Sequence, residues 1–168
     1  MGTMAVLSLS RHSEIMRWSP SLRLESLREQ NARLVTRSAR RYLRAAGFSV
    51  LAELPLPGGR RADLVALAAD GALRIVEVKS SLADFRADRI WMDYRLHCDR
   101  FYFAIPCDLS EEAFPADAGL IVADAHGAML AREAPAHKLA PASRKAMLLR
   151  FAGAAAERLH HALHRDEF

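Results

Sequence analysis

The sequence places two residues with reactive side chains two positions apart in an apolar segment. Glu77 and Lys79 lie within residues 73–79, so in a β-strand both side chains point to the same face of a sheet. A carboxylate and an ammonium group that are buried among apolar residues are costly unless they pair with each other or bind an ion. This cost is the reason to look for a functional site.

Asp63 joins the same site if the turn after its strand has three residues. A two-residue turn would place Asp63 opposite Val78 and away from Glu77. A three-residue turn over residues 69–71 places Asp63 directly opposite Glu77, with the two Cβ atoms about 5 Å apart. Gly71 suits the left-handed position at the end of such a turn. We therefore predict the three-residue turn.

Two carboxylates at that separation repel each other unless a cation lies between them. Oxygen ligands with room for water favour Mg²⁺ or Mn²⁺ over zinc, and we predict Asp63, Glu77 and the backbone carbonyl of Val78 as the metal ligands. Such an ion lowers the pKa of a bound water and stabilises charge on a phosphoryl oxygen. Lys79 would then orient the water, help to deprotonate it, or stabilise the transition state.

The alternative is an ordinary salt bridge on a solvent-facing sheet. In that arrangement Asp63 pairs with Lys79, or Glu77 pairs with an arginine. The Glu-x-Lys tripeptide alone favours this alternative, because it is common. The upstream aspartate, the hairpin spacing and the apolar flanks together favour the site.

The elements that must position these residues form one predicted α/β domain over residues 20–168, after a loose leader over residues 1–19. Apolar residues at helical spacing predict helices at residues 21–46, 81–97 and 141–164. Strands are predicted at residues 48–56, 62–68, 72–79 and 101–105, followed by a hairpin of residues 119–123 and 128–132. This order predicts a mixed central sheet flanked by helices.

Composition favours a soluble protein with a nucleic-acid partner. The 168 residues are 51% apolar and 26% charged, which is typical of one globular domain, and the net charge is +4 with arginine as the main basic residue. No apolar run approaches the ~20 residues of a membrane span. The first ten residues lack the basic segment of a signal peptide, so we expect a cytoplasmic protein. Cys98 and Cys107 are interpreted as reduced structural thiols.

Three residues near the acidic trio are candidates for contact with DNA. Arg60 and Arg61 follow a glycine-rich turn just before Asp63, where both phosphate contact and simple solvation fit the sequence. The Tyr94 hydroxyl is placed to hold water or phosphate, with core packing as the alternative.

Other charged residues are interpreted as structural. Asp84 suits a helix start, and Asp88 suits a surface pair with an arginine. His160 and His164 complement the dipole at the end of the last helix. The basic residues of the first predicted helix are interpreted as a solvated face; they are Arg33, Arg37, Arg40, Arg41 and Arg44.

Two sets of motifs carry a resemblance to known families. The Arg-Ala-Asp of residues 61–63, followed by Ile-Val-Glu-Val-Lys-Ser-Ser at 75–81, resembles the PD-(D/E)XK nuclease superfamily, with Ala62 where that motif has proline. Longer stretches resemble the bacterial MmcB family of DNA repair proteins, namely residues 59–63, 76–81, 83–88, 94–104 and 139–145. The resemblance implies a DNA-damage role and a metal-dependent, endonuclease-like core of helix, three strands, helix and strand.

We therefore expect a Mg²⁺-dependent DNA endonuclease of repair, with Asp63, Glu77 and Lys79 as its catalytic residues. One alternative is a non-catalytic DNA-binding or scaffold module of a repair complex that retains the nuclease fold. Another is a transposition or restriction subunit that needs a partner to choose its target. DNA and other repair proteins are the expected partners, and recognition of DNA by shape and backbone is expected.

Overall fold

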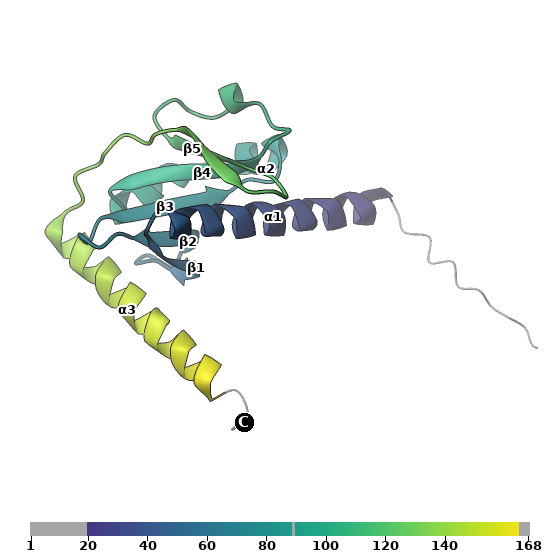
Figure 1. The fold of residues 1–168 in the computed structure, drawn as a ribbon. Helices are drawn as coiled ribbons and strands as arrows, with labels where there is room; N and C mark the ends of the chain where they lie inside the picture. Colours follow the sequence, from purple (N-terminus) through teal and green to yellow (C-terminus); the bar gives the residue numbers. More distant parts are fainter. Residues whose placement is uncertain (1–19, 89, 165–168) are drawn as a thin grey trace, which may run out of the picture.

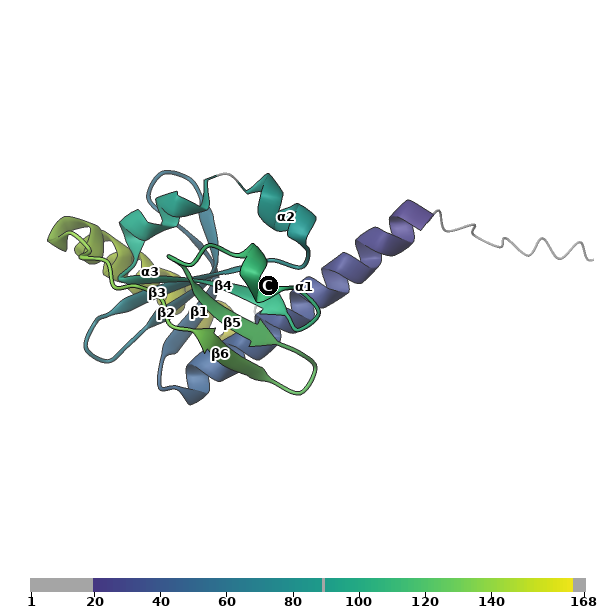
Figure 2. The same cartoon turned by 90° about the horizontal axis from the view of Figure 1, so that it is seen from above.

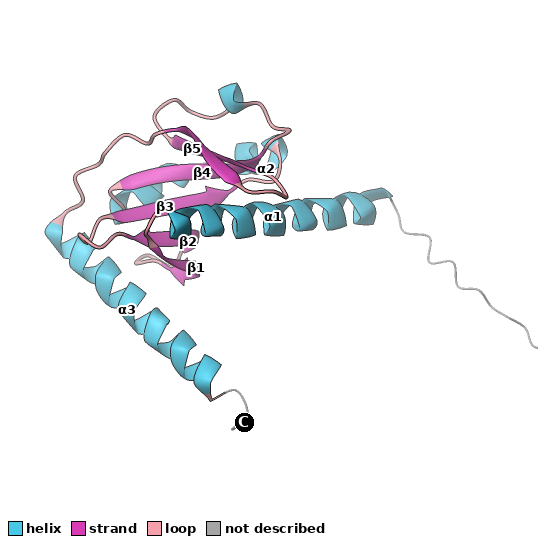
Figure 3. Ribbon diagram, viewed as in Figure 1, coloured by secondary structure: helices cyan, strands magenta, loops and turns pink. Residues whose placement is uncertain are grey.

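The centre of the molecule is a six-stranded mixed sheet in which the strands lie in chain order (Figures 1 and 3). The computed structural model describes residues 20–88 and 90–164, so the predicted leader lies outside the described residues. The strands are β1 (Ser49–Pro55), β2 (Arg61–Leu67), β3 (Leu73–Val78), β4 (Arg100–Pro106), β5 (Gly119–Ala123) and β6 (Ala128–Arg132). Strands β3, β4 and β5 run parallel to one another, and the remaining neighbours are antiparallel. The predicted mixed sheet is confirmed.

Helices cover both faces of this sheet. The long helix α1 (Pro20–Ala45) packs on one face, whereas α2 (Leu82–Ala87), the 3₁₀ helix η1 (Trp91–His97) and α3 (Pro141–Leu163) contribute to the core on the other. A short 3₁₀ turn, η2 (Glu111–Ala113), precedes β5. Figure 2 shows α1 and α2 on opposite sides of the strands.

Alternation along the central strands builds two separate cores. Phe101 and Phe103 of β4 belong to the core on the α2 and α3 side, whereas Tyr102 and Ala104 belong to the core against α1. Successive side chains of a strand point to opposite faces, so a strand between two helical layers must be apolar on both. Charged side chains at the end of β3 are therefore exceptions that need their own partners.

The turn between β2 and β3 has the three residues predicted. The amide of Ala68 donates to the carbonyl of Ala72 at 2.9 Å, and Gly71 takes a positive φ of 85°. The strands then pair Leu67 with Leu73 and continue in that register to Leu64 and Val76. This register directs Asp63 toward Glu77, as the sequence predicted.

An ion pair connects α3 to the start of β3. The Asp99 carboxylate accepts two hydrogen bonds from the Arg144 guanidinium, at 2.8 and 2.5 Å, and one from the amide of Leu73 at 2.7 Å. Burial alone would raise the pKa of Asp99, but these hydrogen bonds outweigh it and lower that pKa. These contacts thus hold the start of β3, at the end of the strand opposite the reactive residues.

The prediction of one helix over residues 81–97 is wrong. The Ser81 hydroxyl accepts from the amide of Asp84 at 3.2 Å and starts α2 as expected, but the helix ends at Ala87. Asp88 leaves helical geometry with φ −87° and ψ 83°, and the chain resumes as the 3₁₀ helix η1. At this position Asp88 contacts Lys79, as described below.

The predicted apolar stripes of the two long helices hold only where the helices cross the sheet. Leu24 and Leu27 of α1 are exposed, as are Leu159 and Leu163 of α3. Figure 1 shows both helices running well past the edge of the sheet, so these leucines lie away from the cores that the described residues form. In the part of the chain that is described, no helix is long and apolar enough to cross a membrane.

Candidate active site

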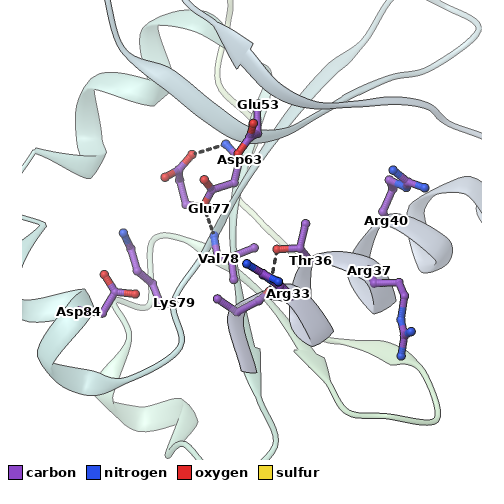
Figure 4. A pocket seen from close by; sticks show the side chains of 11 residues that line it. Arg33, Thr36, Arg37, Arg40, Glu53, Asp63, Glu77, Val78, Lys79 and Asp84 are labelled. Atoms are coloured by element: carbon purple, nitrogen blue, oxygen red, sulfur yellow. Dashed lines mark hydrogen bonds between the residues drawn. The ribbon is translucent and has the colours of Figure 1, made fainter. Parts of the chain in front are cut away.

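The two carboxylates meet where β2 and β3 separate. Backbone pairing between these strands ends at Leu64 and Val76. Beyond that pair the amide of Asp63 donates to Oε1 of Glu77 at 3.0 Å, and the amide of Val78 donates to Oδ2 of Asp63 at 2.8 Å (Figure 4). Side-chain oxygens thus take the place of backbone carbonyls, and the predicted juxtaposition of Asp63 with Glu77 is confirmed.

The surroundings of these carboxylates disfavour their ionised forms. Glu77 is only 4% exposed; burial first, and then the negative charge of Asp63, raise its pKa to about 8. The amide of Asp63, the charge of Lys79 and the hydroxyl of Tyr94 oppose this rise. Burial also raises the pKa of Asp63. Two adjacent carboxyl groups with raised pKa values mark a position where a bound cation would be favourable.

The donor atoms at this position fit a hard divalent cation. Asp63 and Glu77 supply carboxylate oxygens, and the Val78 carbonyl and water would complete an oxygen shell of the kind that Mg²⁺ binds. Within residues 20–88 and 90–164, no group of three or more His, Cys, Asp or Glu side chains is arranged to hold a metal ion. An ion here would therefore depend on these two carboxylates.

Lys79 is buried beside them and has its own partner. Its Nζ lies 2.7 Å from Oδ2 of Asp88, and both side chains are largely shielded from solvent. The interpretation of Asp88 as a surface partner of an arginine is wrong. A buried ammonium group needs a counter-charge, and Asp88, the residue that follows the end of α2, supplies it. The alternative of a direct Asp63–Lys79 salt bridge is not what the structure contains, because Lys79 pairs with Asp88.

Tyr94 both packs in the core and faces the site. Its ring stacks on Phe101 with centroids 5.8 Å apart, and its hydroxyl donates to the carbonyl of Arg61 at 3.4 Å. The pKa of Tyr94 is raised, first by burial and then by the charge of Glu77. The core-packing interpretation of this residue is thus confirmed, and contact of its hydroxyl with water or phosphate stays a prediction.

Arg60 and Arg61 are each paired with an acidic side chain. Arg60 lies 2.8 Å from Asp93, and its guanidinium also lies over the ring of Tyr94. Arg61 lies 3.6 Å from Glu53 in a largely exposed pair. Their predicted contact with phosphate would have to compete with these pairs.

The site opens into a pocket of about 620 Å³ with an acidic side and a basic side (Figure 4). The acidic side contains Glu53, Asp63, Glu77 and Asp84 with Lys79 among them, and the basic side belongs to α1. The lining residues of α1 are Ala32, Arg33, Thr36, Arg37 and Arg40. The prediction of a solvated face for these arginines is confirmed by their exposure, but they also line the site. Their i, i+4, i+7 spacing was visible in the sequence, whereas the position of α1 beside the carboxylates was not.

The remaining candidates stay structural. Cys98 is a buried free thiol and Cys107 an exposed one. Asp84 accepts a hydrogen bond from the amide of Ser80 at 3.2 Å at the start of α2, as predicted, although it also lies at the pocket. The rings of His160 and His164 lie 4.6 Å apart on the last turn of α3.

Together, these features define a mixed α/β protein with two carboxylates and a lysine gathered where its central strands end. The sequence model of the MmcB-like DNA repair protein family matches residues 20–166. The chain belongs to this family of DNA repair proteins.

A solved structure supports the fold. A protein of unknown function from Silicibacter pomeroyi is similar at 40% sequence identity with a TM-score of 0.76, over 82% of this chain and 92% of that one. A comparison with curated proteins finds no match.

The raised pKa of Glu77 predicts a specific pH dependence of stability in the absence of metal. The folded protein holds the proton of Glu77 up to about pH 8, whereas the ordinary pKa of a glutamate is 4.5. Its stabilising effect is therefore complete below about pH 4.5 and is lost as the pH rises through 8. Glu77→Gln mimics the protonated form. In EDTA we expect it to match the wild type near pH 5 and to melt higher by on the order of 5 °C at pH 8.5.

Thermal melts across this pH range check the prediction, with the exposed Glu112→Gln as the matched control. Parallel curves for wild type and Glu77→Gln would contradict the raised pKa. Asp63 titrates in the same direction, so a shallower slope, rather than a flat curve, is expected for the variant.

The Lys79–Asp88 pair predicts a large cost when one partner loses its charge. Asp88→Asn leaves the ammonium group of Lys79 buried without its partner, and we expect a loss of unfolding free energy on the order of 3 kcal/mol. Urea denaturation measures this loss against the exposed control Asp108→Asn. Adding Lys79→Met to Asp88→Asn should cost less than the sum of the single changes. Equal stability of Asp88→Asn and the control would contradict a stabilising role for the ion pair.

Proposed function

We propose that this protein is a metal-dependent DNA endonuclease of the PD-(D/E)XK type that acts in repair within the cytoplasm. The observation that carries the proposal is the meeting of Asp63 and Glu77 at the separated ends of β2 and β3, with Lys79 in the same open pocket. Membership of a DNA repair family supports DNA as the partner. The order of helix, three strands, helix and strand is also the order of such a nuclease core.

In this proposal Asp63, Glu77 and the Val78 carbonyl would hold Mg²⁺ or Mn²⁺. The bound ion supplies a water of lowered pKa and stabilises negative charge on the phosphoryl oxygens. Hydrolysis then forms a bond from a water oxygen to phosphorus and breaks the bond from phosphorus to the leaving sugar oxygen. The water loses a proton, and the leaving oxygen gains one.

Lys79 is the residue of this chain that would act on the reacting groups. Its ammonium group carries three donors, which can orient the attacking water or stabilise charge on a phosphoryl oxygen. Asp88 holds it at the edge of the pocket through the 2.7 Å ion pair. The Tyr94 hydroxyl opposes the rise in the pKa of Glu77, and so would help this carboxyl group to lose its proton when it becomes a ligand.

The second candidate function is a non-catalytic DNA-binding or scaffold module of a repair complex. The observation that favours it is the same ion pair, because a lysine bound to Asp88 is less available to water or phosphate. The hydrogen bonds from the amides of Asp63 and Val78 also occupy one oxygen of each carboxylate.

Cleavage assays separate the two functions. Purified protein is incubated with plain, nicked and branched duplexes and with single strands, in Mg²⁺, Mn²⁺ or EDTA. We expect cleavage that EDTA abolishes and that Asp63→Asn and Lys79→Met each reduce by at least about 100-fold, a typical cost of removing one transition-state contact. Glu112→Gln, a substitution of an exposed residue, is the matched control.

DNA binding by the variants, measured in the same buffers, shows that they remain folded and able to bind. Binding by wild type without cleavage of any substrate in either metal would reject the endonuclease and favour the scaffold. Cleavage that survives Asp63→Asn would point to a contaminating nuclease.

A further inference from the structure

We propose that Arg33, Arg37 and Arg40 of α1 form a surface that binds the phosphate backbone of duplex DNA and places it across the acidic site. We call these three residues the α1 arginine row. The proposal rests on DNA as the partner in the proposed function, but not on cleavage.

The α1 arginine row lies on one side of the pocket that holds the carboxylates. All three side chains line it, and Asp63, Glu77 and Lys79 line it from the ends of β2 and β3 (Figure 4). Because both sides belong to one pocket, a backbone held by the row would lie next to the candidate catalytic residues.

The spacing of the row suits successive phosphates. Positions i, i+4 and i+7 share one helix face, and seven residues of helix span about 10 Å. Phosphates of one strand of a duplex follow each other at about 3.4 Å along the axis, so this length covers about three of them. Arginine binds phosphate through two parallel hydrogen bonds, which fixes position as well as charge.

The row is held on a rigid support and has few competing partners. Val35, Ala39 and Leu43 anchor the opposite face of α1 in the core, and the Ser38 hydroxyl donates to the carbonyl of Asp124 at 2.8 Å. Among the described residues, no carboxylate lies within 4.0 Å of Arg37 or Arg40.

The third member of the row has only a weak internal partner. Arg33 approaches Glu29 at 3.9 Å, and both side chains are strongly exposed. Arg60 and Arg61, in contrast, are already paired with acidic side chains. The α1 arginine row therefore presents more available positive charge than the residues that the sequence first suggested.

The charges and the residue types that line the pocket indicate a duplex rather than a single strand. Acidic side chains line the other side, and those that are ionised repel a polyanion, so an attractive surface beside them is needed to bring a phosphate close. Among the described residues that line the pocket, none is an aromatic residue on which unpaired bases would stack. Contacts to the backbone alone suit a partner whose bases remain paired.

The test is a salt titration of duplex binding in EDTA, where cleavage plays no part. The triple variant Arg33→Gln/Arg37→Gln/Arg40→Gln removes the row. The control triple, Arg28→Gln/Arg41→Gln/Arg150→Gln, removes the same charge from exposed residues that do not line the pocket. Binding of a labelled duplex is measured by fluorescence anisotropy from 50 to 300 mM salt, and circular dichroism confirms that both proteins are folded.

We expect the row variant to bind at least about tenfold more weakly at the lowest salt. The negative slope of the logarithm of the association constant against the logarithm of the salt concentration should become smaller in magnitude by roughly 2.7, as expected when the protein neutralises three fewer phosphates. The control should keep the slope of the wild type. Equal weakening in both triples, or no duplex binding by wild type at low salt, would overturn the proposal.

A parallel titration with a single strand tests the choice of duplex. We expect weaker binding with little dependence on the row, whereas tighter, row-dependent binding of the single strand would overturn that choice. Because no step involves cleavage, a protein that binds through the row but never cuts would reject the endonuclease and leave this surface standing. A protein that cuts DNA but whose duplex binding does not depend on the row would overturn this surface and leave the endonuclease standing.

Discussion

The structure depends on an exchange of hydrogen bonds at one point of the central sheet. Past Leu64 and Val76 the strands β2 and β3 no longer pair through their backbones, and the carboxylates of Asp63 and Glu77 accept from backbone amides instead. Buried amides must find an acceptor, so the carboxylates satisfy a structural need. They also bring two negative charges to a place where ionisation is costly, and the raised pKa of both groups records that cost.

Other irregularities nearby follow from these charges. Lys79 directly follows the last residue of β3 and is buried, so it requires an acidic partner. Asp88 meets this requirement from the position at which the chain leaves the helical geometry of α2, a helix of six residues. The 3₁₀ segment that follows then carries Tyr94 to the carbonyl of Arg61 and toward Glu77. A departure from regular secondary structure is thus tied to the chemistry of the site, as is common where local rules fail.

The sequence predicted the parts of the fold that local rules control. The three-residue turn at Gly71 set the register of β2 and β3, and that register was enough to bring Asp63 to Glu77. Apolar alternation likewise identified the central strands. The prediction of one helix over residues 81–97 failed at Asp88, which contacts Lys79 nine residues earlier, and periodicity does not reveal such a contact. The prediction of a buried stripe was wrong for the exposed leucines near the start of α1 and the end of α3, because an apolar stripe does not show how far the sheet extends.

The arginines of α1 show the same limit at the level of the site. Their spacing was visible in the sequence, but the surface that they share with the carboxylates exists only because α1 lies across the sheet and past its edge. Arg33, Arg37 and Arg40 come from the layer on one face of the sheet, whereas Asp63 and Glu77 come from strand ends within it. No member of the row pairs with Asp63, Glu77 or Asp84 within the described parts of the chain, although all line one pocket. Charges of opposite sign that share a pocket without neutralising each other remain available to a ligand that carries both a negative and a positive charge. A phosphodiester with a bound cation is such a ligand.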